Sequence, residues 1–283
     1  MMLWLNGSFY KVNPAQISVA DRGFLLGDGV FETMRARHGQ VGWLSSHLER
    51  ISRSIDIIGG VSVSLPSKTQ MAEIIATLCQ TFPNPHAVIR LTISRGQGGQ
   101  GLLPAGASEP VVLITAKPFD LEGGKKPVTL AVSKRVRRNP WSVASQIKSL
   151  NYLDNIIARQ EAANAGAEDC LIMTQDGYVG ETTIANIFVL INGQLYTAAK
   201  QNGIFAGLAR DFVIDWAQRN DIAICYDPVA IGHLKAAEYV IVCNALRGIR
   251  AVSSVEGEML VQSEYGRDLH KKLSAALEMS VRG

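Results

Sequence analysis

The sequence predicts a folded protein of one or two domains that contains both helices and strands. Hydrophobic residues make up 47% of its 283 residues, as in a packed globular protein and not in a disordered one. Apolar runs of helical and of strand type follow one another along the chain. Residues 117–127 carry two prolines and two glycines, a composition typical of a linker. We therefore expect an N-terminal domain at 1–117, a linker at 118–127 and a C-terminal domain at 128–283.

The N-terminal part alternates between strand-like and helix-like segments. A glycine-rich loop from Gly23 to Gly29 allows tight turns before a strand that ends near His38. The helices have apolar residues three and four positions apart, and Ser45 or Ser46 is a candidate cap for the first helix. We expect strands at 3–5, 30–37, 87–94 and 111–116, and helices at 45–58 and 67–81 that pack against the sheet.

The part after the linker has the same mixture of segments. Apolar residues at helical spacing begin around Lys148 and continue to Gly166, a residue type that commonly follows a helix C-terminus. Two strands meet at the Asp176-Gly177 turn. We expect helices at 148–165, from about 207 and at 269–279, and strands at 128–132, 169–174, from 178, 187–191, 194–197 and within 238–252.

Lys148 and Glu181 are the residues that point most directly to a function. They are 33 positions apart, one at the start of an expected helix and the other in an expected hairpin. Each alone is ordinarily a solvated residue, but these two occur within the surroundings SLNYL and GETTIANIF. A neutral lysine amine can form an imine with an aldehyde and later move protons. A carboxylate facing a pyridine nitrogen keeps that nitrogen protonated, so that the ring accepts electrons.

This stretch resembles the core of the fold-type IV pyridoxal-phosphate (PLP) enzymes, the class IV aminotransferase family. The resemblance extends from Asn6 to about Gly257. The family includes branched-chain and D-amino-acid aminotransferases and 4-amino-4-deoxychorismate lyase. The resemblance implies an α+β fold, with an N-terminal α/β sandwich-like domain and a C-terminal pseudo-barrel domain that binds PLP. It also implies a homodimer with PLP in the cleft between the domains.

The resemblance implies a set of cofactor contacts. Lys148 matches the lysine that forms the imine with PLP, and Glu181 matches the glutamate that faces the pyridine nitrogen. Arg50 lies in HLERI, which is similar to an HxxR element whose arginine binds the PLP phosphate, and a guanidinium fork suits phosphate oxygens. The helix that begins near Gly207 matches a second phosphate contact, because helix N-termini bind anions. The implied PLP-binding residues are Arg50, Lys148, Tyr152, Glu181, Leu208, Ala209, Asn244 and Ala245.

Two features favour the lyase branch of the family. Thr33 stands where that branch tends to have a catalytic threonine and branched-chain enzymes tend to have glycine. The segment CNAL, residues 243–246, is similar to a loop of the lyase branch. Gln100 and Leu102 are a departure, because family members often have an arginine there that binds a substrate carboxylate. The implied catalytic residues are Lys148 and Thr33, and the implied substrate-binding residues are Phe31, Arg95, Gln100 and Leu246.

Three functions remain open at this point. The first is a PLP-dependent lyase that converts 4-amino-4-deoxychorismate into 4-aminobenzoate and pyruvate for folate biosynthesis. The second is an aminotransferase that acts on a D-amino acid, a branched-chain amino acid or another amine. The third is a binding or structural protein that has kept the fold without catalysis, and Lys148 argues against it. We expect the lyase, with the aminotransferase as the alternative.

Composition narrows the ligands and partners. The net charge of +3 is small for this length and favours an anionic small molecule over nucleic acid. The basic run at 134–138 is either a solvated face or an attraction for such a substrate. The four cysteines lack the paired spacing of zinc or disulfide sites, so we expect no metal. We recognise no signal peptide and no membrane-spanning run, and therefore expect a cytoplasmic enzyme without membrane contact.

Overall fold

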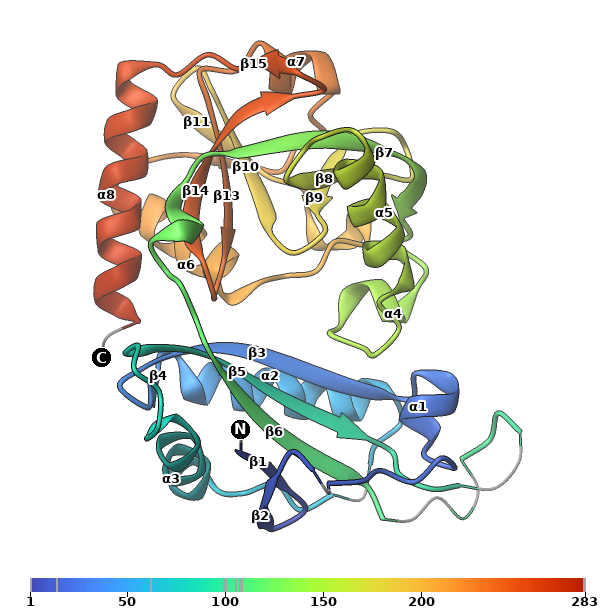
Figure 1. The fold of residues 1–283 in the computed structure, drawn as a ribbon. Coiled ribbons are helices and arrows are strands. Elements are labelled where there is room, and N and C mark those ends of the chain that lie inside the picture. The colour runs from blue at the N-terminus through green and yellow to red at the C-terminus, as the bar shows by residue number, and fades with distance from the viewer. Residues whose placement is uncertain are drawn as a thin grey trace. The chain divides into compact units, whose positions relative to one another are not determined.

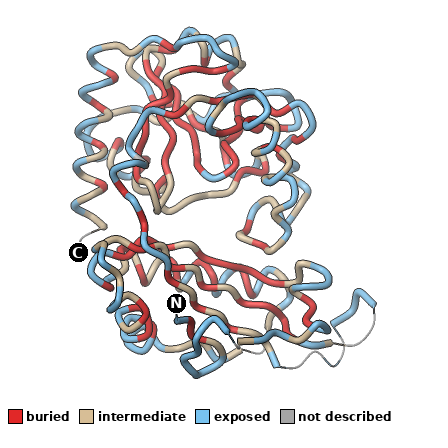
Figure 2. Tube along the Cα trace, viewed as in Figure 1, coloured by how far each residue is buried: buried red, intermediate tan, exposed pale blue. Residues whose placement is uncertain are grey.

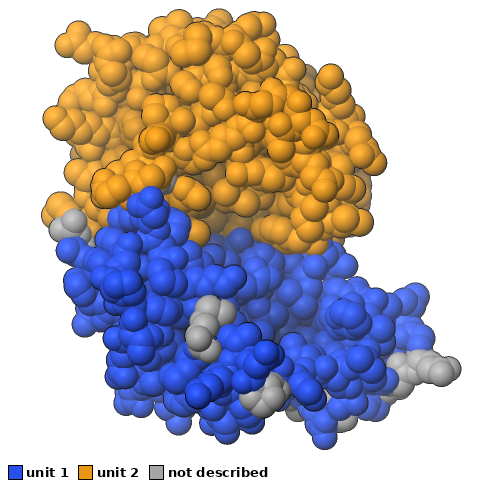
Figure 3. All heavy atoms as spheres, viewed as in Figure 1, with its two compact units in different colours: residues 1–121, 147–151, 281–283 blue, residues 122–146, 152–280 orange. Residues whose placement is uncertain are grey.

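The structure is a computed structural model, which describes residues 2–13, 15–61, 63–98, 101–104, 106 and 109–281. The chain divides into two compact units (Figure 3). Unit 1 comprises Met1–Leu121, Ile147–Asn151 and Val281–Gly283, and unit 2 comprises Glu122–Gln146 and Tyr152–Ser280. Both units combine helices with strands (Figure 1), which confirms the expected α+β class.

Unit 1 is built on one antiparallel sheet with the strand order β2-β1-β6-β5-β3-β4. The long strands β3 and β5 pair along their whole length, from Gly29 opposite Ser94 to Arg37 opposite His86. The strands are β1 (Met2–Leu5), β2 (Ser8–Lys11), β3 (Gly29–Arg37), β4 (Gln40–Val41), β5 (His86–Ser94) and β6 (Val111–Pro118), and the helices are α1 (Arg22–Leu26), α2 (Leu44–Ile57) and α3 (Lys68–Cys79).

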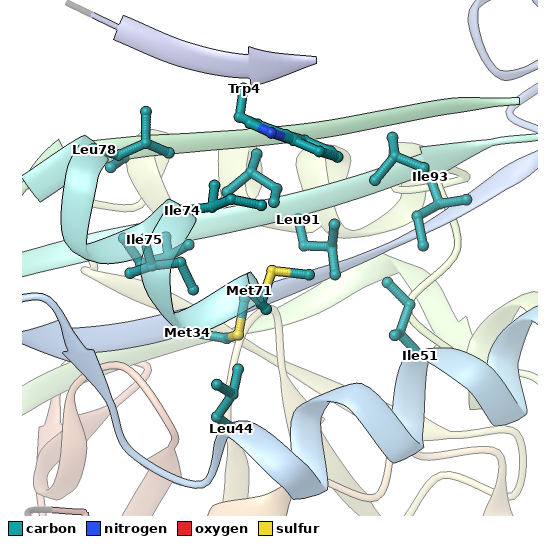
Figure 4. Packing of buried hydrophobic residues seen from close by; sticks show 14 of the residues in the cluster. Trp4, Met34, Leu44, Ile51, Met71, Ile74, Ile75, Leu78, Leu91 and Ile93 are labelled. Carbon is teal, nitrogen blue, oxygen red and sulfur yellow. The ribbon is translucent and has the colours of Figure 1, made fainter. Parts of the chain in front are cut away.

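The core of unit 1 lies between this sheet and the helices α2 and α3. Side chains alternate between the two faces of a strand, so Met34 of β3 and Leu91 of β5 point to the same side. They meet Ile51 of α2 and Met71 of α3 (Figure 4). These four side chains are at most 1% exposed, and burial of each contributes about 1.5–3 kcal/mol.

The two core helices begin in different ways. Ser67 and Gln70 form a capping box at the start of α3, as the sequence pattern of a helix at 67–81 allows. Helix α2 begins after Trp43, which has a left-handed backbone with a φ of 56°. The expected capping role of Ser45 or Ser46 is therefore wrong, because both lie inside the helix. Burial of Leu44 fixes the first residue of α2 to the core.

The lysine segment, residues 147–151, is an extended stretch that lies beside β3. Ser149 forms a β-bridge with Val30, and the Phe31 N–H donates to the Lys148 carbonyl at 2.8 Å. The expectation that a helix begins at Lys148 is therefore wrong, since the helix starts only after this segment. Local spacing fits a helix here, but the backbone pairs with a strand that is distant in the sequence.

Unit 2 is built on a sheet with the order β12-β11-β10-β13-β14-β7-β8-β9. Strand β9 also pairs with β10, so the strands from β10 to β9 close into a barrel-like sheet. The strands are β7 (Val128–Arg138), β8 (Asp169–Thr174), β9 (Val179–Thr182), β10 (Asn186–Ile191), β11 (Gln194–Tyr196), β12 (Ile224–Cys225), β13 (Tyr239–Asn244), β14 (Gly248–Val255) and β15 (Glu258–Met259). The helices are α4 (Val143–Gln146), α5 (Leu153–Asn164), α6 (Leu208–Arg219), α7 (Ile231–Lys235) and α8 (Glu264–Ser280), with 3₁₀ turns η1 (Gly123–Lys125) and η2 (Lys200–Asn202).

Helix α5 packs on the barrel through small residues. The strands of the barrel are mostly buried, while much of the surface of helix α5 is exposed (Figure 2). Ala158 and Ala162 are completely buried in a cluster with Ile172 of β8. Leu153 and Ile156, two of the apolar residues whose helical spacing predicts this helix, are 66% and 52% exposed. The alanines allow the helix axis to approach the sheet closely, which larger side chains would prevent.

The strand expected at 128–132 continues to Arg138 as β7, so the basic run is part of a strand. Most of the basic side chains in the run are exposed, but Arg138 is only 6% exposed. Within the described part of the chain, no helix has the length and hydrophobicity needed to cross a membrane. In the same residues, no group of His, Cys, Asp or Glu side chains could hold a metal ion.

Candidate active site

One face of the unit 1 sheet carries residues that the sequence predicts to act in catalysis. The bridge between Val30 and Ser149 sets Lys148 opposite Phe31, and the register of β3 with β5 sets Phe31 opposite Thr92. Directly opposite residues on paired strands project to the same face. Lys148, Phe31 and Thr92 therefore form a row on the face that is turned away from α2 and α3.

A second row on this face holds Thr33, which lies opposite Arg90. The Phe31 ring contacts two cations, with its centroid 5.0 Å from Lys148 Nζ and 3.8 Å from Arg90 Cζ. Arg90 Nε donates a hydrogen bond of 3.2 Å to Thr92 Oγ1. The structure thus brings the predicted residues Lys148, Thr33 and Phe31 together on one face, and it adds Arg90 beside them.

The other face of β3 holds a buried polar network around Glu32. Arg50 Nε and Nη2 donate to the two carboxylate oxygens of Glu32 at 2.6 and 2.7 Å. His47 Nδ1 lies 2.8 Å from the same carboxylate. This paired contact fixes the orientation of the guanidinium predicted to bind the PLP phosphate. Arg50 projects from the buried side of α2 and is 8% exposed.

The pKa values in this network are strongly shifted. Burial alone raises the pKa of Glu32, but the hydrogen bonds and charges of His47 and Arg50 outweigh burial and lower it to about 2. Burial lowers the pKa of His47, and the positive charges of Arg50 and Lys148 lower it further against the opposing effect of Glu32. Glu32 is therefore ionised and His47 neutral near pH 7.

In unit 2, the carboxylate of Glu181 is held on β9 by three groups. Arg138 Nε lies 2.7 Å from Glu181 Oε1, and the Phe205 N–H donates to the same oxygen at 3.1 Å. Asn186 Nδ2 donates to Glu181 Oε2 at 3.1 Å. With 4% exposure, Glu181 is a buried carboxylate in a fixed orientation, as a contact to a protonated pyridine nitrogen requires.

Asn186 connects Glu181 to the start of helix α6. Its amide donates to the Phe205 carbonyl at 2.6 Å and accepts from the Gly207 N–H at 3.1 Å. Gly207 is the residue before α6, and it offers no side chain to cap the amides of Leu208 and Ala209. A Cβ atom at Gly207 would lie 2.5 Å from Asn186 Oδ1, so this close approach requires glycine.

A further chain of hydrogen bonds fixes the loop between β9 and β10. Arg138 Nη1 donates to Asn155 Oδ1 at 3.1 Å, and Asn155 Nδ2 donates to the Thr183 carbonyl at 2.6 Å. The Thr183 hydroxyl donates to buried Asp169, which also forms a 3.0 Å ion pair with Arg159. Helix α5 and strands β7 and β8 thereby hold Thr183, at the start of the loop that follows β9.

The loop after β13 is closed by Asn244. Its side-chain oxygen accepts from the Leu246 N–H at 3.0 Å and from the Arg247 N–H at 2.7 Å. Its amide donates to the Ile184 carbonyl at 3.3 Å. The side chain of Asn244 thus organises its own turn, and the half-buried Ala245 lies within that turn.

Comparison with known proteins agrees with this arrangement. The sequence profile described as amino-transferase class IV matches residues 29–255. The chain belongs to the class IV aminotransferase family. A relative from Methanocaldococcus jannaschii named "Putative branched-chain-amino-acid aminotransferase" is 32% identical over 96% of this chain and 94% of its own. The aminodeoxychorismate lyase of Bacillus subtilis is 31% identical over 77% of this chain and 74% of its own.

A solved structure of a class IV member has the same fold. The crystal structure named "Putative 4-amino-4-deoxychorismate lyase" from Legionella pneumophila superposes with a TM-score of 0.84 and 28% identity. The match covers 95% of this chain and 97% of that one. The class IV relatives thus include proteins with both lyase and aminotransferase names, and the fold is common to both.

Class IV enzymes depend on PLP, and the chemistry of the residues present fits this cofactor. In unit 1, Lys148 supplies an amine and Arg50 a guanidinium. In unit 2, Glu181 supplies a buried carboxylate, and the start of α6 supplies uncapped amides of the kind that bind phosphate.

The other residues singled out from the sequence have varied positions. Arg95 donates to the carbonyls of Gly60 and Ile58 and lies 2.8 Å from Asp28, so its contacts bind the chain of unit 1 together. Tyr152 is the half-buried residue before α5. Gln100 lies outside the described residues. Leu102, the other departure from the expected arginine, is 85% exposed. Leu246 is half-buried.

Sequence reasoning missed four residues of these sites. Arg138 was hidden in a basic run, where only strand alternation distinguishes one buried arginine from exposed ones. Asn186 is part of GETTIANIF, but its side-chain role depends on backbone groups of Phe205 and Gly207, which meet β10 only in the fold. Glu32 and Arg90 each interrupt an apolar strand with a charge, and this signal is visible in the sequence.

Proposed function

We propose that this class IV enzyme is a 4-amino-4-deoxychorismate lyase, which forms 4-aminobenzoate and pyruvate for folate biosynthesis with PLP as its cofactor. The observation that carries the proposal is the position of Thr33. Its hydroxyl-bearing side chain projects from the same sheet face as Lys148, one row along β3. Glycine, which branched-chain members tend to have at this position, would offer no hydroxyl there.

The residues on this face suit an elimination that ends in an aromatic ring. When bound, PLP supplies an electron sink for the carbon that carries the substrate amine. Lys148 is the base that takes the proton from that carbon, and Thr33 orients or relays a proton. The electron pair released from the C–H bond forms a new double bond in the substrate ring, and the bond from the adjacent ring carbon to the enolpyruvyl oxygen breaks. The enolpyruvate gains a proton and becomes pyruvate, while the ring becomes 4-aminobenzoate.

Phe31 supports this role by its contacts. Its ring is 4% exposed, and it packs between the second row of the face and the lysine segment. The ring excludes water next to Lys148 Nζ and, through its contact with the Arg90 guanidinium, fixes the side chains around that amine. Because formation of the aromatic ring drives the elimination, the main task of the enzyme is to hold the reacting carbon next to a fixed base.

An aminotransferase is the second candidate function. The relative from Methanocaldococcus jannaschii, which carries a branched-chain aminotransferase name, matches nearly the whole chain. In this reaction Lys148 would return the proton to the carbon of the bound cofactor, and PLP would carry the amino group from the amine substrate to a keto acid. Lys148, Arg50 and Glu181 serve both reactions, whereas Thr33 is needed for the first.

Product analysis of the purified enzyme separates the two functions. With 4-amino-4-deoxychorismate and no added keto acid, we expect 4-aminobenzoate and pyruvate in equal amounts. Thr33→Ala should slow the reaction at least tenfold, within the range of about 10²–10⁴ for general acid–base groups, while Thr33→Ser keeps most of the rate. If no 4-aminobenzoate forms and an amino acid converts the cofactor to pyridoxamine phosphate, the aminotransferase takes the place of the lyase.

We further propose that the enzyme is a homodimer. Support comes from apolar side chains at the surface of unit 1, where Phe24 and Leu25 of α1 are 76% and 60% exposed. Leu102 and Leu103 in the nearby loop are 85% and 79% exposed. Arg22 of α1 donates to the Leu102 carbonyl at 2.8 Å, which holds the two groups next to each other.

A further inference from the structure

Arg90 occupies an unusual position for a cation. Its neighbours Ile89 and Leu91 are completely buried in the core of unit 1. Strand alternation turns Arg90 to the opposite face, where it is half-buried and lies between Thr33 on β3 and Thr115 on β6. An arginine in the middle of a central strand costs desolvation, and its head group is well placed for a ligand of opposite charge on that face.

The contacts of Arg90 hold its head group near the reacting lysine. Its guanidinium lies over the Phe31 ring, and Arg90 Nε donates to Thr92 Oγ1. Lys148 Nζ lies over the same ring. Both cations therefore lie over one side chain, and one small amine with a carboxylate can reach Lys148 with its nitrogen and Arg90 with its carboxylate. Stacking uses the flat face of a guanidinium and leaves its donors in the plane of the group.

The charge of the surrounding face has one sign. The strand register assigns positions 31, 33, 35 and 37 of β3, 88, 90 and 92 of β5, and 113, 115 and 117 of β6 to this face. All of these are described residues, and none of them is an aspartate or glutamate. The charged residues are Arg35, Arg37, Arg90, Lys117 and, from the lysine segment, Lys148. Such a surface attracts anions and favours them beside Lys148.

We propose that Arg90 binds a carboxylate of the substrate. The inference rests on the proposed function in one respect, since it takes Lys148 as the group next to the substrate amine. Arg90 then does from strand β5 what an arginine at the position of Gln100 or Leu102 would do from a loop. The substrate class is an amine with a carboxylate a few ångströms from its nitrogen, and the planar guanidinium pairs with both carboxylate oxygens.

The test compares two ligands of nearly the same shape, one with a carboxylate and the other with a neutral carboxamide in its place. 4-Aminobenzoate and the neutral 4-aminobenzamide are titrated into the PLP-loaded enzyme, and their dissociation constants are obtained from the change in cofactor absorbance. We expect the parent to prefer the carboxylate. Arg90→Met should weaken 4-aminobenzoate binding by about tenfold to a hundredfold, as for a lost hydrogen bond to a charged group, and leave 4-aminobenzamide within about twofold. Arg90→Lys should restore part of the preference, because it keeps the charge without the fork.

Arg37→Met is the matched control, because Arg37 lies on the same face of β3, further along the strand and exposed. At physiological salt this variant should bind both ligands within about twofold of the parent, because the exposed Arg37 charge is screened and makes no direct contact in the proposal. If Arg90 only supports the Phe31 ring, Arg90→Met weakens both ligands alike and Arg90→Lys rescues neither. That result, or an unchanged preference in Arg90→Met, overturns the proposal.

Failure of the proposed function gives a different pattern. In that case the parent releases no 4-aminobenzoate from 4-amino-4-deoxychorismate, whatever Arg90 does. The same comparison is then made between D-alanine and D-alanine amide and between L-leucine and L-leucine amide. Binding is again measured by the change in cofactor absorbance. A carboxylate preference that Arg90→Met abolishes in any pair supports Arg90 as the carboxylate ligand. A parent that shows no preference in any of the pairs refutes it.

Discussion

Glu32 is a charge held inside unit 1 by two partners. With 1% exposure, an isolated carboxylate at this position would lose its hydration without compensation. The paired hydrogen bonds from Arg50 and the contact with His47 supply that compensation and also orient Arg50. Removal of the negative charge would leave the Arg50 guanidinium without its buried counter-ion. Glu32 thus affects both the stability of unit 1 and a group that fits the PLP phosphate.

The shifted pKa of Glu32 predicts how stability depends on pH. The folded-state pKa of about 2 lies below the ordinary 4.5, so ionised Glu32 stabilises the fold above pH 4.5, and this is lost as the pH falls towards 2. The shift corresponds to about 3 kcal/mol. We expect Glu32→Gln to be less stable than the parent near pH 7, and the difference to shrink as the pH falls below about 4.5 in urea unfolding.

Glu49→Gln is the control, because Glu49 is an exposed carboxylate on the same helix as Arg50. Burial also lowers the pKa of His47 from its ordinary value of 6.5. As the pH falls below 6.5, the protein therefore loses stability through His47 before Glu32 begins to contribute. The comparison is therefore made below about pH 4.5. A Glu32→Gln variant that loses free energy of unfolding as steeply as the parent in this range would contradict the assigned shift.

Single residues could be predicted where a short motif carries the information. Lys148, Phe31 and Thr33 were predicted from their immediate surroundings, and the structure places them on one face. Arg90 could not be added to them, because its neighbours follow from the register of β3 with β5. In the sequence these two strands are separated by helices α2 and α3. Arg95 illustrates the reverse case. It is close in the sequence to a loop that the resemblance implies to bind substrate, but this closeness does not predict its bonds to Gly60 and Ile58.

At the level of elements, Asn186 joins strand β10 to helix α6. Its amide donates to Glu181 and Phe205, and its oxygen receives the Gly207 N–H. We expect Asn186→Asp to weaken PLP binding at least tenfold, because the new carboxylate faces Glu181 and has no proton to donate. Asn186→Ala should weaken PLP binding by a similar or smaller factor. The measurement is the PLP dissociation constant of the apoenzyme, with circular dichroism to confirm the fold.

The matched control is Asn220→Asp at the other end of α6. Asn220 is exposed, and its side-chain amide donates to the Trp216 carbonyl in the same helix. This variant should bind PLP like the parent. If Asn186→Asp binds PLP as tightly as Asn220→Asp does, the link between Glu181 and the start of α6 has no part in cofactor binding.

Elements were predicted well where the signal is local. The helix expected at 67–81 and the strands expected on either side of the Asp176-Gly177 turn depend on a few neighbouring residues, and the corresponding elements are present. The lysine segment was mistaken for a helix start because Leu150 fits helical spacing. Its backbone is instead paired with β3, and such long-range hydrogen bonding leaves no periodic trace in the sequence.

At the scale of the whole chain, the barrel-like sheet of unit 2 is the feature least visible in the sequence. Each strand has its own apolar pattern, but closure depends on the contact of β9 with β10 beside Glu181 and Asn186. Only the resemblance to class IV enzymes implied this closure. Physical reasoning from periodicity alone predicts the strands and leaves their order open.

The exposed apolar residues of α1 and its neighbouring loop predict the assembly of the molecule. Large exposed apolar patches on folded proteins commonly mark interfaces, and the patch of Phe24, Leu25, Leu102 and Leu103 has no covering element among the described residues. Arg22 holds the loop on α1 through the Gly101 and Leu102 carbonyls, so the patch is presented as one surface. A second copy of the chain is the proposed occupant.

Light scattering during size-exclusion chromatography should therefore give twice the chain mass of 30.6 kDa. The double variant Phe24→Ser with Leu102→Ser should shift the protein to the monomer, because burial of each large apolar side chain contributes about 1.5–3 kcal/mol and each is lost in both copies. Met259→Ser is the control, since Met259 is 76% exposed on β15 of unit 2, away from the patch in sequence and element. A parent that elutes as a monomer, or a double variant that remains a dimer at low micromolar concentration, excludes this patch as the dimer interface.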